Sequence, residues 1–176
     1  MFDLIEYTKD PNQIKHKLKQ YLKQAKDGAV VFDIDETLFV NLEEDKIAIH
    51  PLGHSLYKFA KQQGRQIILV TAREGDPSSR KYVLAQLEQM GYHDFDMVYM
   101  QPKHAESTAM YKYQTRNKIK EQFGRIVLNL GDQISDHFVQ ADEQEQLLTS
   151  VLHPRTYYVL KINNDPSDLS LKLIEI

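Results

Sequence analysis

The sequence predicts a three-layer α/β/α sandwich built on a mostly parallel sheet. Short apolar runs at 29–32, 66–70, 97–100 and 126–130 contain almost no polar residues, which is typical of strands covered on both faces. Segments of helical length separate these runs, so strands and helices alternate along the chain. Glycine follows three of these segments, at the position where helices commonly end.

The individual elements are expected in the following order. The first helix covers 11–26, because Asp10 can cap it, Pro11 suits its first turn and Gly28 follows its end. Four further helices are expected over about 53–63, 78–90, 108–123 and 134–148, and a fifth strand over 157–162. The residues after Lys161 form a turn and then an alternating run, which suits either an edge strand or a contact with a partner.

Length and composition favour one domain covering residues 1–176. Lys and Arg total 22 against 25 Asp and Glu, so the net charge of −3 gives no general attraction to nucleic acid, although a local basic patch is compatible with it. The absence of cysteine excludes disulfides, thiolate metal ligands and cysteine nucleophiles. An acidic N-terminus and the lack of a long apolar stretch predict a cytoplasmic chain without a signal peptide or a membrane span. The sequence does not indicate an oligomeric state.

Two carboxylates, Asp33 and Asp35, follow the first apolar run and are separated by one residue. Like charges so close disfavour each other's ionisation, so the pair indicates a site that needs both groups. Asp33 would attack a phosphate, while Asp35 would protonate the leaving alkoxide and then take a proton from water. Thr37 is a candidate substrate contact. The alternative is that Asp35 and Thr37 only cap the following helix or turn.

Residues after the other runs are expected to meet Asp33, because the carboxyl ends of parallel strands share one sheet edge. Thr71 ends the second run, and its hydroxyl can donate to a phosphate oxygen. Arg73, and His104 after the third run, are candidate substrate contacts. The alternative for Arg73 is an ordinary surface position.

A lysine is also needed to neutralise the nucleophile and the phosphate. Lys112 shares a helical stripe with Ile119 and Phe123 that is expected to face the sheet, whereas Lys118 lies among polar residues. Lys112 is therefore expected to hold the phosphate, with Lys118 as the alternative.

The last run is followed by Gly131, Asp132 and, one helical turn later, Asp136. Glycine would let the backbone turn sharply after the strand. With Asp33, the two carboxylates provide oxygen ligands that suit Mg²⁺. The alternative is that Asp132 caps a helix.

The motif D-I-D-E-T at 33–37, Thr71, Lys112 and the motif G-D-Q-I-S-D at 131–136 together resemble the haloacid dehalogenase (HAD) superfamily, over roughly residues 29 to 140. F-D-I-D-E-T-L and the Y-K-x-x-x-R pattern at 111–116 are most similar to the class B and class C acid phosphatases and the plant vegetative storage proteins. The resemblance implies a Rossmann-like fold and a Mg²⁺-dependent phosphatase in which Asp33 is phosphorylated and Asp35 is the general acid/base. It also implies that Thr71 and Lys112 hold the phosphate, and that the metal ligands are Asp33, the backbone carbonyl of Asp35, Asp132 and Asp136.

Only 35 residues separate Asp35 from Thr71, which leaves no room for a large cap domain, so we expect a minimal cap or none and an open cleft. The leading hypothesis is a hydrolase of small phosphomonoesters. A nucleic-acid end (3′-) phosphatase and a non-catalytic binding or storage protein are the alternatives, and the sequence does not indicate the substrate.

Overall fold

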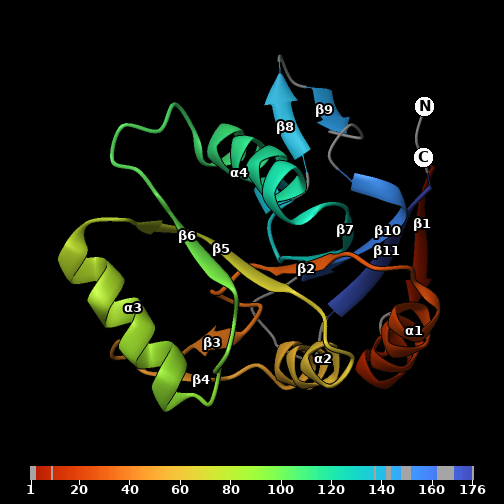
Figure 1. Ribbon diagram of the computed structural model, residues 1–176, viewed down its shortest axis with the longest axis horizontal. Coiled ribbons are helices and arrows are strands. Elements are labelled where there is room, and N and C mark those ends of the chain that lie inside the picture. Colours follow the sequence, from red (N-terminus) through yellow and green to blue (C-terminus); the bar gives the residue numbers. More distant parts are fainter. Residues whose placement is uncertain are drawn as a thin grey trace.

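The computed structural model describes residues 3–8, 10–136, 138–141, 144–147, 152–161 and 169–175. Its centre is a seven-stranded sheet with the order β1-β11-β10-β7-β2-β5-β6 (Figure 1). The five strands from β10 to β6 are parallel, whereas β11 is antiparallel to both β10 and β1. The seven strands are β1 (Asp3–Thr8), β2 (Ala29–Phe32), β5 (Ile67–Glu74), β6 (Met97–Gln101), β7 (Ile126–Leu130), β10 (Leu152–Lys161) and β11 (Leu169–Glu175).

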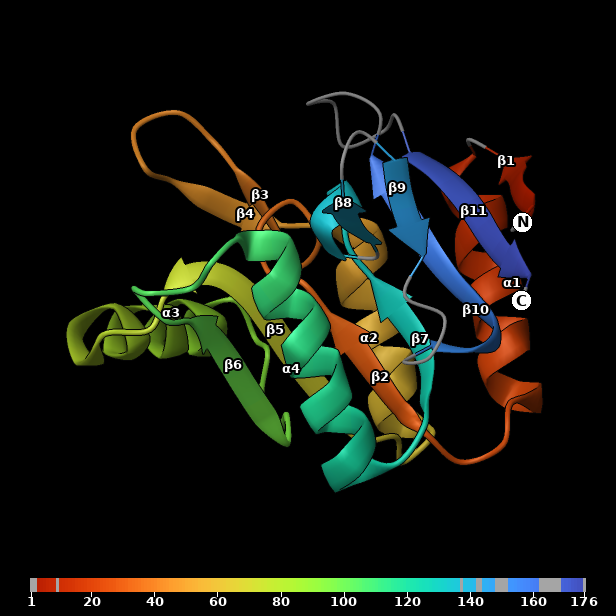
Figure 2. The ribbon, with the colours of Figure 1, turned by 90° about the horizontal axis from the view of Figure 1, so that it is seen from above.

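Helices cover both faces of this sheet, which confirms the predicted α/β architecture. Three helices lie on one face, namely α1 (Pro11–Gln24), α2 (Pro51–Gln62) and α3 (Pro77–Gln89), and α4 (Thr108–Phe123) lies on the other (Figures 1 and 2). In β2, Val30 and Phe32 belong to the core under the first three helices, while Ala29 and Val31 pack on the α4 side. Since side chains alternate between the two faces and both faces are covered, the strand is continuously apolar.

The chain order creates a switch point at the centre of the sheet. From β2 the chain continues through β5 to β6 on one side, and then returns to β7 on the other side of β2. The backbone amide of Asp33 donates to the carbonyl of Leu130 at 2.9 Å, so the carboxyl ends of β2 and β7 lie side by side. In open α/β sheets this is the place where ligands bind.

The predicted helix over 134–148 is wrong. A 3₁₀ turn, η1 (Ile134–Asp136), is followed by a hairpin of β8 (Phe138–Ala141) and β9 (Gln144–Leu147). The Asp136 carbonyl accepts hydrogen bonds from Asn129 Nδ2 at 2.9 Å and from Arg116 Nη1 at 2.5 Å. Because these side chains occupy that carbonyl, it is not left to accept the amide that would continue a helix.

A second hairpin lies where the sequence predicts no element. It consists of β3 (Phe39–Asn41) and β4 (Ile47–Ile49), and it projects from the sheet edge where β2 ends (Figure 2). Glu44 and Asp45 at its tip have φ of 58° and 57°, in the left-handed region. The segment between the first motif and α2 thus holds only this small hairpin.

The remaining differences concern the ends of helices and strands, and those of the helices amount to one or two residues. β5 extends to Glu74 rather than Val70, so Thr71 and Arg73 lie within it, and its register against β6 is irregular between Thr71 and Glu74. The alternating run near the chain end is β11, an interior strand between β1 and β10, and β1 was not predicted. Ile162, in the predicted fifth strand, lies outside the described residues. None of the helices in the described ranges combines the length and the apolar character that crossing a bilayer requires.

Candidate active site

The centre of the site is an ion-paired group of buried side chains at the switch point. Asp33 directly follows β2 and is 6% exposed. Lys112, near the start of α4 and 3% exposed, donates from Nζ to Asp33 Oδ1 at 2.8 Å and also to Asp136 Oδ1. The lysine therefore joins the ends of β2 and β7 from the face of the sheet that α4 covers. The exposed Lys118 makes no such contact.

Burial dominates the electrostatics of these groups. It raises the pKa of Asp33 well above the ordinary range; Asp136 raises it further, and Lys112 opposes the shift. Burial alone would lower the pKa of Lys112, but Asp33 and Asp136 raise it more, so its pKa lies above the usual value. Burial also raises the pKa of Asp132. The site thus favours cations strongly, because its carboxylates are costly to ionise without them.

Asp33, Asp132 and Asp136 offer carboxylate oxygens within 4.8 Å of one another. Asp132 accepts from Gln133 Nε2 at 2.9 Å, and Asp136 accepts from the Gln133 amide at 2.9 Å, which fixes both carboxylates in one turn. Clustered oxygen donors are the ligand set that Mg²⁺ prefers, so these residues fit the ion. The ligand predicted from Asp35 is its backbone carbonyl, and its carboxylate is not part of this cluster.

Gly131 serves the cluster for a reason other than the one predicted. Its φ is not positive, so a left-handed turn does not require glycine here. A Cβ on this residue would lie 2.2 Å from Asp136 Oδ2. Glycine is needed because the carboxylate packs directly against its backbone.

Arg116 is a further site residue that was not predicted to have a role. It is 1% exposed, and its hydrogen bond to the Asp136 carbonyl, shared with Asn129, holds the 3₁₀ turn in place. Its Nε and Nη2 donate to no described residue, and burial lowers its pKa to about 10. Its spacing of four from Lys112 was the available signal, because both must then lie on one buried helix face.

Asp35 forms a separate pair on the other side of β2. Arg73 binds it through both oxygens, from Nη2 to Oδ1 at 2.5 Å and from Nε to Oδ2 at 2.8 Å. Asn41 Nδ2 also donates to Oδ1 at 3.2 Å. The hydrogen bonds to Asp35 raise the pKa of Arg73, so the arginine is firmly cationic. Arg73 therefore contacts the predicted acid/base residue.

The two threonines lie in the same region but differ in their bonding. Thr71 is fully buried and its Oγ1 accepts from the Arg73 amide at 3.2 Å, which leaves the hydroxyl proton for another acceptor. Thr37 is 8% exposed, and its Oγ1 forms no hydrogen bond within the described part of the chain. Between Asp35 and Thr37, Glu36 has a φ of 57°, a left-handed conformation that costs about 1 kcal/mol for a residue with a side chain.

His104 is not brought to this group. It is exposed in the loop between β6 and α4, where it lines a separate cavity of about 340 Å³ with Tyr111 and Gln114. No contact between His104 and the Asp33 group is present in the described residues.

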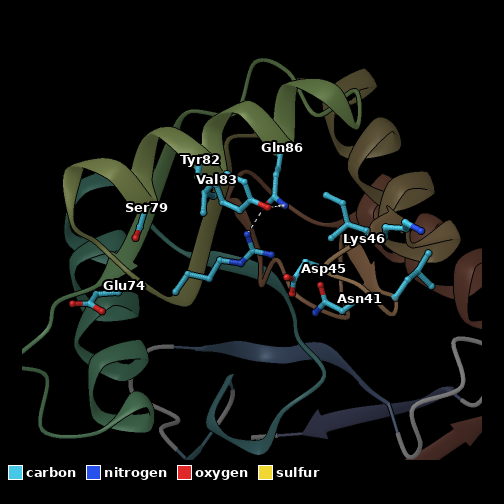
Figure 3. Close-up of a pocket in the computed structure, with 11 residues that line it drawn as sticks. Asn41, Asp45, Lys46, Glu74, Ser79, Tyr82, Val83 and Gln86 are labelled. Atoms are coloured by element: carbon cyan, nitrogen blue, oxygen red, sulfur yellow. Dashed lines mark hydrogen bonds between the residues drawn. The ribbon is translucent and has the colours of Figure 1, made fainter.

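A larger cavity of about 520 Å³ opens beside Asp35, between the β3–β4 hairpin and α3. Figure 3 shows Gln86 and Tyr82 of α3 opposite Asn41 and Asp45 of the hairpin. Charges in its wall are balanced, because the lining residues include two basic side chains, Arg73 and Lys46, and two acidic ones, Asp45 and Glu74. The β3–β4 hairpin, which the sequence did not predict, thus forms one side of the cavity.

Comparison with known proteins identifies the family. Residues 43–160 match the family described as HAD superfamily, subfamily IIIB (acid phosphatase). The chain belongs to this family. The matched segment begins after the motif at 33–37 and contains Thr71, Lys112, Asp132 and Asp136.

A relative with a similar sequence is acid phosphatase 1 of Solanum lycopersicum, which is 28% identical over 159 residues. The alignment covers 74% of this chain and 62% of the tomato protein, so the chain spans less than two thirds of that relative. Membership of subfamily IIIB confirms the resemblance to the acid phosphatase branch of the HAD superfamily that the motifs indicated.

Proposed function

We propose that this chain is a Mg²⁺-dependent phosphomonoester hydrolase that works through an aspartyl-phosphate on Asp33. The observation that carries the proposal is the Lys112–Asp33 ion pair inside a cluster of three carboxylates at the sheet switch point. A buried carboxylate with a raised pKa is a poor nucleophile by itself, so cations must hold it ionised. Lys112 provides one such charge.

The first half of the reaction forms the phosphoenzyme. An oxygen of Asp33 attacks phosphorus, the bond from phosphorus to the leaving oxygen breaks, and Asp35 supplies the proton to that oxygen. Thr71 and Lys112 would hold the phosphate oxygens, and Thr37 and Arg73 would provide further contacts. In the second half Asp35 takes a proton from water, the water oxygen attacks phosphorus, and the bond to Asp33 breaks.

Asp33, Asp132 and Asp136, with the backbone carbonyl of Asp35, would hold Mg²⁺, which when bound neutralises charge on the phosphate and on the nucleophile. The chain's own cations contribute to this charge neutralisation but do not replace that of Mg²⁺. Lys112 bonds two of the three carboxylates and Arg116 bonds the Asp136 backbone carbonyl, so two positive charges accompany three negative ones before the substrate adds its own charge.

A small phosphorylated compound is the proposed substrate, with its leaving group in the cavity beside Asp35. The cavity wall carries acids as well as cations, which does not favour a polyanionic nucleic acid over a small molecule. His104 remains a proposed substrate contact only for ligands that extend to the loop after β6.

The test is phosphate release from p-nitrophenyl phosphate with and without Mg²⁺. We expect Asp33→Asn to reduce the rate at least about 10³-fold, because the amide cannot form the phosphoenzyme. Removing Mg²⁺ with a chelator should reduce the wild-type rate as strongly. Asp27→Asn, at an exposed position before β2, is the matched control and should keep the wild-type rate. Full activity of Asp33→Asn would refute the mechanism.

A further inference from the structure

We propose that Gln86 is a positioning residue for proton transfer, acting through Arg73 on Asp35. The inference rests on the proposed function, and it assigns a role to a side chain of α3 that touches neither Asp33 nor Asp35. It follows from a continuous series of hydrogen bonds between the cavity wall and the proposed acid/base.

The position of Asp35 depends on Arg73. Asp35 follows the end of β2, and both of its carboxylate oxygens accept from the guanidinium, with Asn41 as the remaining contact. A bidentate pair of this kind fixes the plane of the carboxylate as well as its distance. A shift of the Arg73 guanidinium would therefore shift the Asp35 carboxylate with it.

The position of Arg73 depends in turn on Gln86. Arg73 Nη1 donates to Gln86 Oε1 at 2.5 Å, and the guanidinium lies over the Phe39 ring, 5.7 Å from its centroid. With Nε and Nη2 bound to Asp35, these contacts hold the guanidinium at three nitrogens and on one face. Asp35 and Phe39 both belong to the segment that follows β2, whereas Gln86 belongs to α3.

Gln86 itself is held in one orientation. It is 8% exposed, on the helix face that also carries the core residues Val83 and Leu87, and its Nε2 donates to the Tyr82 hydroxyl at 3.1 Å. A reversed amide would place its NH₂ group against the guanidinium. The guanidinium, which can only donate, therefore selects the orientation that presents oxygen to Arg73, and Tyr82 holds the NH₂ group on the other side of the amide.

Arg73, Gln86 and Tyr82 also line the cavity in which the leaving group would lie (Figure 3). The series thus connects the leaving-group site to the residue that must protonate the leaving oxygen. A change in Gln86 should affect reactions according to how much they need that proton. Alkoxide leaving groups need it, whereas p-nitrophenolate is stable without it.

The experiment compares Gln86→Leu with wild type on glycerol 2-phosphate and on p-nitrophenyl phosphate. We expect kcat for glycerol 2-phosphate to fall about tenfold or more, and that for p-nitrophenyl phosphate to change less than about threefold. Gln89→Leu, an exposed glutamine on the same helix, is the matched control and should leave both rates unchanged. An equal loss on both substrates, or no loss on either, would overturn the proposal.

A second variant covers the case in which Gln86→Leu does not fold. Tyr82→Phe removes only the hydroxyl that orients Gln86, and Tyr82 is 57% exposed, so the core is unaffected. Relative to wild type, its kcat should fall by about two- to threefold on glycerol 2-phosphate and by less on p-nitrophenyl phosphate. An equal relative change on both substrates would count against the proposal. If the wild-type chain hydrolyses neither substrate, the proposed function fails instead, so the two failures are distinguishable.

Discussion

Lys112 determines the charge balance at the proposed nucleophile, because its ammonium group is buried between two carboxylates. In Lys112→Gln, Asp33 and Asp136 would lose this ion pair. Breaking a buried pair on one side typically costs about 3–5 kcal/mol. We expect a lower melting temperature and at least about a hundredfold lower phosphatase rate.

Lys118→Gln is the matched control on the same helix, since this lysine is exposed. It should keep the wild-type rate and melting temperature. Thermal melts with and without Mg²⁺ add a second readout: Mg²⁺ should recover part of the stability lost in Lys112→Gln, because it can neutralise the same carboxylates. If Lys118→Gln were the inactive variant, Lys118 would be the phosphate-binding lysine, and the ion pair of Lys112 would have no role in catalysis.

For single residues, the sequence predicted some contacts of the site but not others. Asp33, Lys112, Asp132 and Asp136 could be brought together from spacing alone, because strand ends and one helix stripe locate them. The pairing of Arg73 with Asp35 could not be predicted. It depends on the irregular register between β5 and β6, which determines where the arginine side chain starts.

Among the elements, α2 restrains the loop that carries the motif at 33–37, which the sequence did not indicate. Its Gly53 packs so closely on the motif loop that a Cβ would lie 1.8 Å from the Thr37 carbonyl oxygen. The His50 side chain caps the same helix end by accepting from the Gly53 amide at 3.4 Å. Helix and loop are therefore fixed against each other by backbone contact, which no side-chain adjustment can relieve.

Gly53→Ala is accordingly expected to displace the loop that carries Asp35 and Thr37. We expect a stability loss of about 1–3 kcal/mol from the steric clash, and a reduced kcat in the fraction that folds. Urea unfolding and the p-nitrophenyl phosphate assay measure the two effects. Lys58→Ala, exposed on the same helix, should show neither. A fully active and stable Gly53→Ala would mean that the loop can move without consequence.

The predictions of elements succeeded where one local signal was sufficient. β2, β7 and α4 were predicted to the residue, because both strands are apolar on both faces and the helix has a serine cap and a terminal glycine. The β3–β4 hairpin has strands of only three residues, too short to establish a period. The prediction of a helix over 134–148 failed because two side chains outside that segment, Arg116 and Asn129, end the 3₁₀ turn.

For the whole molecule, two buried tyrosines connect segments that are distant in sequence. The Tyr57 hydroxyl donates to the His93 carbonyl at 2.5 Å, and the Tyr92 hydroxyl donates to the Leu38 carbonyl at 2.7 Å. Their rings pack edge to face, 5.0 Å apart. Burial raises the pKa of both phenols above the ordinary value. The native state thus holds both groups protonated.

This arrangement predicts a loss of stability in alkali. A group with a pKa raised by folding contributes fully below its unfolded pKa, here about 10, and loses the contribution as pH rises toward its folded pKa. Above pH 10 the free energy of unfolding should fall by up to about 1.4 kcal/mol per pH unit for each tyrosine. Lys112, whose pKa is also raised, acts in the same direction. Urea unfolding from pH 8 to 11 measures the total.

The variant Tyr92→Phe separates the tyrosine contribution from that of the lysine. It should lose about 1 kcal/mol at pH 8, because the Leu38 carbonyl loses a buried hydrogen bond. Above pH 10 its stability should fall less steeply than that of wild type, so the two curves should converge. Parallel curves would show that Tyr92 ionises equally in the native and unfolded states, contrary to its burial.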